Sequence, residues 1–567
     1  MSLVAEFTSF PDFKAIVPEE IESKITALIE SNLSAIEKLL IQKGPYTWEN
    51  LIVPLESIED KLSQTWSPIH HLNSVCNAPV LRQAHQNCLS KLSDYATKIG
   101  QNPKLYEAFQ NIKASQQFKM LNKPQQKVIQ DALRDFALSG VALPQAERLE
   151  FSKVKQKLSQ LQSQFENNVL DASDGWFLDI TDLDMLQGVP EHALKSAQAK
   201  AKLANVSGYR FGLDFPSYFA IITYADNRKL RQQFYTAYTT RASNEGPQAG
   251  KWDNKEIIDD ILNLRHEQAK LLGFKNYAAL SLQKKMAKTE EAVFTFLDEL
   301  VQKARPFALQ EYETLKTFSQ KLGLEDFAVW DIPYYSEKLR QEKYEISQES
   351  LRPYFPLPKV LSGLFEIVKK LYGIRIHPVT HFITYHKDVK FFEIKDDQDN
   401  LRGYFYLDCY ARVHKRGGAW MDEARVRRQL EKEGGVQSPI AYLTCNFTPP
   451  VGDLPALLTH DEVSILFHEF GHGLHHMLTK VDYAPVSGIN GVPWDAVELP
   501  SQFMENWCWQ EEALALISEH VDTKEPLPRA LLDKLHQAKN FQSGMLLMRQ
   551  LEFSLFDFRL HTEFLPG

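Results

Sequence analysis

The segment from Leu454 to Lys480 constrains this chain more than any other, because it places two histidines four residues apart in a helical pattern. His468, Glu469 and His472 form an HExxH sequence, and the apolar residues around it recur at spacings of three and four. On an α-helix the two histidines project from one face, about 6 Å apart along the axis, which suits two imidazole nitrogens that bind one zinc ion. Glu469 then lies beside the metal.

The start of this helix is also encoded. Thr459 is followed three residues later by Glu462, which is the spacing of a capping box. Inside the helix, Gly471 costs about 1 kcal/mol relative to alanine, and a close approach by another element would explain it. We therefore expect crowding near the metal.

A catalytic zinc site usually has three protein ligands and one open position for water. His475 shares the helical face, but it lies seven residues beyond His468, about 10.5 Å farther along the axis. Glu498 is the better candidate, because a carboxylate from a second helix can approach the two histidines from the side. The loop between the helices, APVSGINGVP, has the residues of a turn.

One further acid is expected to orient a ligand histidine through its second ring nitrogen. Asp461, Asp495 and Glu505 are alternatives for this role, and Glu498 and Glu505 lie near one face of the second helix. For Asp461, a surface charge in the capping turn explains its presence equally well.

Outside this motif the sequence predicts a mainly α-helical protein with a small β-sheet. Helical spacing dominates residues 18–168 and 227–323, and residues 175–225 contain short aromatic and β-branched runs that predict brief strands. Two β-prone runs flank the polar residues 396–400 and predict a hairpin, and Ile440–Phe447 is a candidate third strand. The pattern of apolar and polar residues changes near residue 190.

Length and charge exclude several classes of protein. A chain of 567 residues is long enough for two or more cores, so it is not a small binding module. The net charge is −9 and no block of Lys and Arg is present, which argues against a nucleic-acid partner. The five cysteines form no CxxC pair, and neither a signal sequence nor a long apolar segment is found, so we expect a cytoplasmic protein with no membrane partner.

Three segments together resemble one family. HEFGHGLHHML, VSGINGVPWDAVELPSQFMENWCW and YLDCYARVHKRGGAW are similar to the thimet oligopeptidase family, and the likeness covers essentially the whole chain. The resemblance implies that His468, His472 and Glu498 bind one zinc ion and that Glu469 is the general base.

The resemblance also implies a fold and a substrate. It implies a two-lobed, zincin-type helical metallopeptidase with a deep channel, which hydrolyses short peptides. We place a helical region at residues 1–190 and a catalytic region at residues 191–567, and we expect a monomer. Members of the family continue for roughly a hundred residues with a Gly- and Tyr-rich segment that stabilises the oxyanion, and this segment is expected to be missing here. Losing one oxyanion donor can lower turnover by about 10² to 10³.

Several residues are weaker candidates for substrate contact. The strands at residues 389–413 and 440–447 offer an edge to an extended peptide, or else buttress the zinc helix. His414, Lys415 and Arg416 suit a substrate carboxylate, although a basic cluster beside two glycines is typical of a solvated loop. Tyr404 and Tyr406 are candidates for the cleft wall, although aromatic residues in strands usually pack.

Two other functions fit the sequence. A catalytically impaired form or fragment would keep the zinc site and bind peptides without cleaving them. An unrelated helical scaffold would carry the HExxH pattern by accident and purify without metal.

Overall fold

The helical pattern predicted for the first third of the chain is present. The computed structural model describes residues 10–42, 44–430, 435–450, 452 and 454–567. Of its first seven α-helices, all but the short fifth bury apolar residues at helical spacing, and the seventh does so against residues of a later helix. The seven helices are α1 (Pro18–Leu39), α2 (Val53–Val75), α3 (Pro79–Gly100), α4 (Pro103–Ala114), α5 (Gln116–Met120), α6 (Lys123–Leu138) and α7 (Gln145–Asp174).

The predicted short strands are β1 (Phe177–Ile180) and β2 (Tyr209–Gly212), which pair antiparallel although α8 (Glu191–Leu203) lies between them in the chain. After β2 the chain returns to helices up to residue 372. These are α9 (Phe215–Tyr224), α10 (Arg228–Thr239), α11 (Lys255–Leu271), α12 (Tyr277–Ser281), α13 (Glu290–Lys321), α14 (Ile332–Tyr344), α15 (Gln348–Leu351) and α16 (Leu357–Tyr372). The mainly α class is therefore correct.

A five-stranded sheet has the order β3-β4-β5-β9-β6, with β5 and β9 parallel and the other pairs antiparallel. Its strands are β3 (Arg375–Pro378), β4 (Lys390–Lys395), β5 (Leu401–Tyr410), β6 (Trp420–Arg425) and β9 (Ile440–Phe447), and β7 (Arg428–Gln429) pairs separately with β8 (Val436–Gln437). The predicted hairpin and third strand are thus confirmed. The prediction that β5 or β9 offers an edge is wrong, because each has a neighbour on both sides, and among the described strands the edges of this sheet are β3 and β6.

The sheet separates two hydrophobic cores. Phe405, Leu407 and Leu443 point into a cluster that contains residues of α16 and α17, whereas Tyr406 and Tyr442 point toward α1, α2 and α3. This alternation follows from the two-residue period of a strand. The N-terminal helices therefore pack directly on the sheet that supports the candidate site.

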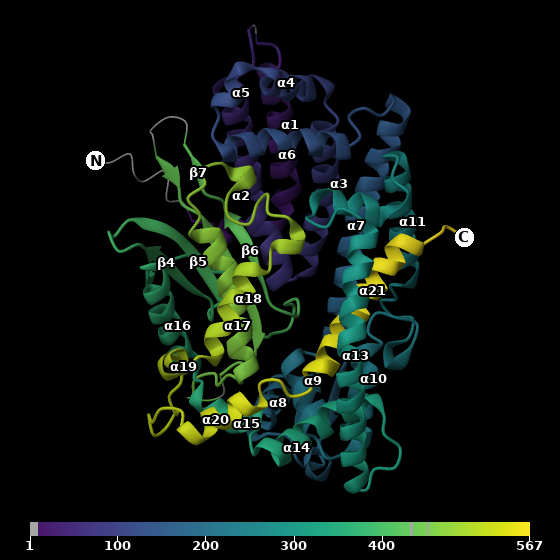
Figure 1. Ribbon diagram of the computed structural model, residues 1–567, viewed down its shortest axis with the longest axis vertical. Coiled ribbons are helices and arrows are strands. Elements are labelled where there is room, and N and C mark those ends of the chain that lie inside the picture. Colours follow the sequence, from purple (N-terminus) through teal and green to yellow (C-terminus); the bar gives the residue numbers. More distant parts are fainter. Residues whose placement is uncertain (1–9, 43, 431–434, 451, 453) are drawn as a thin grey trace.

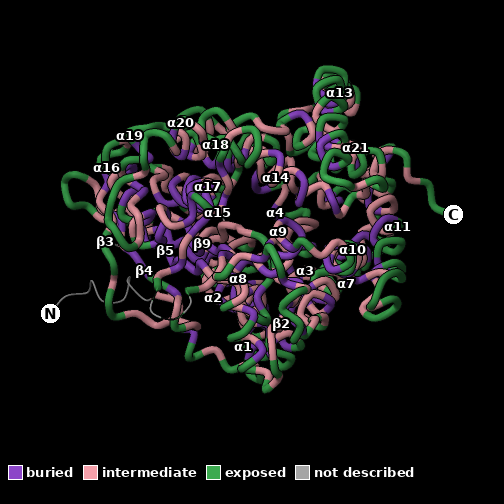
Figure 2. Tube along the Cα trace, turned by 90° about the horizontal axis from the view of Figure 1, so that it is seen from below, coloured by how far each residue is buried: buried purple, intermediate pink, exposed green. Residues whose placement is uncertain are grey.

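The last helices are α17 (His460–Met477), α18 (Leu499–Glu505), α19 (Glu511–Ile517), α20 (Arg529–Ala538) and α21 (Ser543–Glu563). Figure 1 shows α17 and α18 side by side in one half of the molecule, and α21 along α13 in the other half. In Figure 2, α17 is largely buried, whereas α13 and α21 lie at the exposed rim. Within the described residues, no helix is long and apolar enough to cross a membrane.

The division of the chain at residue 190 stays a prediction. In the structure this position lies between the paired strands β1 and β2, whose residues share one hydrophobic cluster with α8, α9 and α10.

Candidate metal centre

The helix that carries HExxH begins as the sequence predicts. The hydroxyl of Thr459 accepts a hydrogen bond from the backbone N–H of Glu462 (3.1 Å), and the Glu462 carboxylate accepts one from the backbone N–H of Thr459 (2.8 Å). These two bonds satisfy two of the N–H groups that a helix start leaves unpaired. The capping box fixes the start of α17 and so the positions of the residues two turns later.

The structure brings His468, His472 and Glu498 together. Glu498 Oε2 lies 3.1 Å from the Nε2 atom of each histidine, and the three candidate ligand atoms all lie within 4.8 Å of one another. Glu498 is the residue that caps α18 rather than one inside it. The hydroxyl of Ser501 donates to Glu498 Oε2 (2.8 Å) and holds the carboxylate in place.

This donor set fits a zinc ion. Two imidazole nitrogens and one carboxylate oxygen are a typical catalytic zinc set, and neighbouring ligand atoms of a tetrahedral site lie about 3.3 Å apart. The observed separations of 3.1 Å match that spacing. Burial lowers the pKa of His472, which favours the neutral imidazole that a metal requires.

Glu505 lies on the other side of the His468 ring. Its Oε1 atom is 2.7 Å from His468 Nδ1, so the ring presents Nε2 to the candidate metal position. Of the other two acids considered for this role, Asp495 instead accepts hydrogen bonds from the backbone N–H groups of Met286 and Ala287. Asp461 is exposed in the first turn of α17.

Glu469 lies beside the three ligand candidates and is only 6% exposed. Burial raises the pKa of its carboxyl group to about 7; nearby Glu498 raises it further, while His468 opposes the shift. Its Oε2 atom is buried without a hydrogen-bond partner among the described residues. Such an atom is available to a ligand or to water.

The crowding predicted from Gly471 is real, and its cause is the second helix. A Cβ atom on Gly471 would lie 2.6 Å from the carbonyl oxygen of Pro500 and 2.6 Å from Ser501 Cα. Because both are backbone atoms of α18, the two helix backbones meet at this point. This contact brings Glu498 within reach of the histidines.

His475 does not join this group. It is absent from the cluster of candidate ligands found among the described residues, and its Nδ1 atom is buried without a hydrogen-bond partner there. His475 lies about one helical turn beyond His472. Its distance from His468 along the helix axis keeps it out of the ligand group, as the sequence predicts.

The structure places Tyr404 and Tyr406 in the core rather than in a cleft. Their exposed fractions are 9% and 0%, and both rings pack against Phe391 on the face of the sheet that α1, α2 and α3 cover. The side chains of alternate strand residues point to opposite faces, and these two point away from α17. Neither residue lines the site.

The basic segment after β5 divides into buried and exposed parts. Lys415 is fully buried and donates to Asp408 Oδ1 (2.8 Å), so it is not free for a substrate. His414 is exposed, and its backbone N–H donates to Asp174. Arg416 is exposed and lies at the wall of a cavity of about 500 Å³ beside the start of β6.

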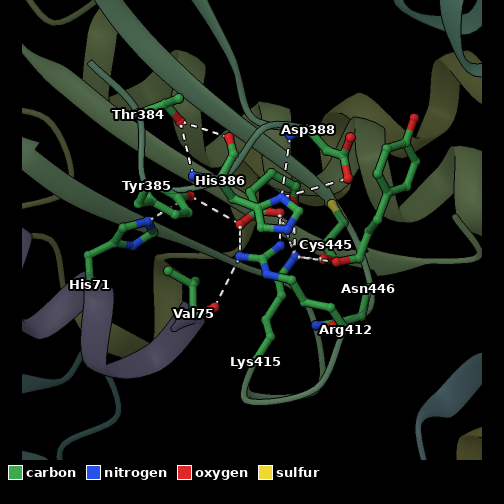
Figure 3. A network of polar contacts seen from close by, with 12 residues as sticks. His71, Val75, Thr384, Tyr385, His386, Asp388, Arg412, Lys415, Cys445 and Asn446 are labelled. Carbon is green, nitrogen blue, oxygen red and sulfur yellow. Dashed lines mark hydrogen bonds and ion pairs between the residues drawn. The ribbon is translucent and has the colours of Figure 1, made fainter. Parts of the chain in front are cut away.

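Sequence reasoning missed the polar network around Asp408. Arg412 donates two hydrogen bonds to this carboxylate, each 2.7 Å long, and a third to the carbonyl oxygen of Val75 in α2. Figure 3 shows Arg412, Lys415, Val75, Tyr385 and His71 of this network. The Tyr385 hydroxyl donates to Asp408 Oδ2 (3.1 Å) and lies 2.9 Å from His71 Nε2. The network joins the loop before β6 to the N-terminal helices. The LDCYARVHK segment holds both charges of the pair, but sequence spacing alone does not show that they are buried.

Comparison with known proteins gives consistent matches. Residues 221–566 match the model of peptidase family M3, and residues 22–148 match the N-terminal domain of neurolysin and thimet oligopeptidase. Oligopeptidase A from Escherichia coli is 51% identical over 557 residues, which span 98% of this chain and 82% of that protein. Dipeptidyl carboxypeptidase from the same organism is 30% identical, over 91% of this chain and 75% of that protein.

A solved structure, PZ peptidase A with an inhibitor, superposes on this chain with a TM-score of 0.55 at 14% identity. The match covers 98% of this chain and 77% of that one. At this identity the likeness concerns the fold.

Proposed function

This chain belongs to peptidase family M3, and we propose that it is an endopeptidase that hydrolyses short oligopeptides with one zinc ion and a glutamate general base. In this proposal His468, His472 and Glu498 bind the ion. The observation that carries it is the approach of Glu498 Oε2 to within 3.1 Å of both histidine Nε2 atoms.

A bound zinc ion would polarise the scissile carbonyl group and acidify a water molecule. Glu469 accepts the proton of the attacking water and then delivers it to the leaving amine. Burial makes this carboxyl group a better proton acceptor than an exposed glutamate, which suits a general base. Glu505 keeps the His468 ring in the orientation that presents Nε2. No covalent bond to the protein forms.

Strand β6 supports the binding of an extended peptide. It is one of the two edge strands of the sheet, and no described strand pairs with its outer side. An extended peptide can add there as a further strand, and main-chain hydrogen bonds then give affinity with loose sequence preference. We also retain a monomer and a cytosolic location as predictions, which sedimentation and cell fractionation test.

The test is the substitution Glu469→Gln, which keeps the size of the side chain but removes the base. We expect cleavage of a quenched fluorescent peptide to fall about 10²- to 10⁴-fold, with the zinc content of the purified protein unchanged. Glu512→Gln, at an exposed position in α19, is the matched control and should keep full activity.

Full activity in Glu469→Gln protein would refute the proposed general base. A protein that binds zinc and peptide but never cleaves would support the peptide-binding alternative. Purification without metal, together with failure to take up zinc, would refute the metal site itself.

A further inference from the structure

Glu423 is a strand residue whose carboxylate faces a large cavity. It lies near the end of the edge strand β6, with Ala441 of β9 as its partner in the sheet. The cavity has a volume of about 990 Å³, and Glu423 lines it together with residues of α2, α6 and the loop at residues 484–493. Strand β6 also contacts α17, the helix that carries His468 and His472, so Glu423 lies on a strand beside the candidate metal centre.

Within the described residues, the Glu423 carboxylate has one hydrogen bond, which Asn490 Nδ2 donates to Oε2 (3.0 Å). Burial raises the pKa of this carboxyl group to about 7, the bond from Asn490 lowers it, and the nearby Asp422 and Asp60 raise it further. Burial, one amide and two acids thus set the pKa of Glu423. Among the described residues this carboxylate has no cationic partner.

The other acids of this wall already have partners. Asp60 pairs with Arg428 (3.0 Å), Glu59 accepts a hydrogen bond from Tyr95, and Glu56 accepts one from the backbone N–H of Ala484. Glu423 therefore differs from Asp60 in having no cationic partner among the described residues, and from Glu59 in its position on the edge strand β6.

The bases on the facing wall are engaged as well. Lys127 and Arg134 pair with Asp131, and Lys284 pairs with Asp135. Lys285 donates to Ser281, and Lys288 donates to the carbonyl oxygen of Lys285. None of these contacts involves Glu423.

The geometry of β6 leads a bound peptide toward this carboxylate. On α2, the hydroxyl of Ser67 donates to the carbonyl oxygen of Glu423 (2.7 Å), so α2 covers the strand edge at this residue. Glu423 lies two residues after Met421, which corresponds to about 7 Å along a strand. A peptide that pairs with the start of β6 thus reaches the cavity within two or three of its own residues.

We propose that Glu423 is a specificity residue that binds a positively charged group of the peptide, either a Lys or Arg side chain or the free amino terminus. This inference rests on the proposed peptidase function. A partly buried carboxylate that has no cationic partner gains more from an incoming cation than a fully exposed one does, because less water competes for the cation.

The test compares peptides that differ by one charge. In a set of quenched fluorescent octapeptides, one position at a time carries lysine or norleucine, which keeps the alkyl chain but lacks the ammonium group. A second pair has a free or an acetylated amino terminus. The two pairs separate the side-chain source of the charge from the terminal source.

For the wild-type protein we expect kcat/KM to be at least about tenfold higher for the charged member of one pair. Glu423→Gln keeps a side chain that can accept the hydrogen bond from Asn490, and it should lower the ratio of kcat/KM between the charged and the uncharged peptide to about one. Glu59→Gln, in the same cavity but paired with Tyr95, should keep the preference. A purely structural role for Glu423 would change both members of a pair equally.

Three results would overturn the proposal: a wild-type protein without preference, a Glu423→Gln protein that retains the preference, or a Glu59→Gln protein that loses it. Should Glu423→Gln fail to fold, the wild-type comparison and Glu423→Asp, with a weakened preference expected, still decide. Binding of the same peptides to zinc-loaded Glu469→Gln protein, measured by fluorescence anisotropy, reports the preference without turnover. If the wild-type protein cleaves none of the peptides, the proposed peptidase function is wrong. If the charged and uncharged peptides of each pair bind with equal affinity, the role assigned to Glu423 is wrong.

Discussion

Glu505 Oε1 lies 2.7 Å from His468 Nδ1, on the side of the imidazole ring opposite the Nε2 atom that faces Glu498. A single short helix, α18, thus contacts both nitrogens of one histidine, with Glu498 as its cap and Glu505 as its last residue. Because a carboxylate at Nδ1 fixes the tautomer and makes Nε2 a better ligand, Glu505 should affect metal binding without touching the metal.

Replacing Glu505 by alanine should therefore weaken zinc binding about 10- to 100-fold. Competition with a chromophoric chelator measures the affinity. The control is Glu512→Ala, at an exposed position in the next helix. Unchanged zinc affinity in Glu505→Ala protein would show that the hydrogen bond does not orient the ring.

Gly471→Ala should destabilise the protein although alanine is the better helix former. The new Cβ would meet backbone atoms of α18 at 2.6 Å, and overpacking of this kind costs about 1–3 kcal/mol, more than the gain of about 1 kcal/mol in helix propensity. Urea unfolding measures the change, and zinc affinity should fall with it.

Gly473→Ala is the matched control for this prediction. On the same helix, its Cβ would meet only the side-chain ends of Leu443 and Met477, at 3.1 Å. These ends can move, so we expect a smaller effect. Equal losses in the two variants would contradict the role assigned to the α17–α18 contact.

Asp408→Asn should be strongly destabilising, because it leaves the buried Lys415 and Arg412 without a negative partner. The expected loss in the free energy of unfolding is about 3–5 kcal/mol. Calorimetry or urea unfolding measures it, with Asp397→Asn in the exposed hairpin turn as the control. A loss no larger than that of the control would mean that water or a rearrangement satisfies the two cations.

Acid should destabilise the fold partly through His71. Burial lowers the pKa of this ring to about 3, and Asp408 only partly opposes the shift, whereas the unfolded value is about 6.5. Between these two values the unfolded chain binds more protons than the folded one. The free energy of unfolding therefore falls as the pH drops from about 6.5 toward 3, and this contribution is absent above that range.

His71→Gln removes this titration and should make the fall in stability between pH 6.5 and 4 shallower. Urea unfolding at several pH values measures the slope, with the exposed His381→Gln as the control. An identical slope in His71→Gln and the control would assign the acid sensitivity to other groups.

Much of the site could be predicted because its residues are close in sequence. The capping box at Thr459 and the four-residue spacing of His468 and His472 are local, and an α-helix converts such spacing directly into direction. The close approach of another element at Gly471 could also be predicted, because glycine destabilises the interior of a helix and needs a structural reason there.

The sequence also left three acids as equal candidates for orienting a histidine, and only the packing of α18 on α17 selected Glu505 over Asp461 and Asp495.

By itself, therefore, the sequence determined the helices, the hairpin and the HExxH face, because each depends on hydrogen bonds and side-chain periods within a few residues. The tertiary structure decided which face of the sheet Tyr406 joins, that Lys415 is buried on Asp408, and that Glu423 lines a cavity and pairs with no cation among the described residues. These outcomes depend on how elements far apart in the chain pack, and strand periodicity gives two faces without saying which one each helix covers.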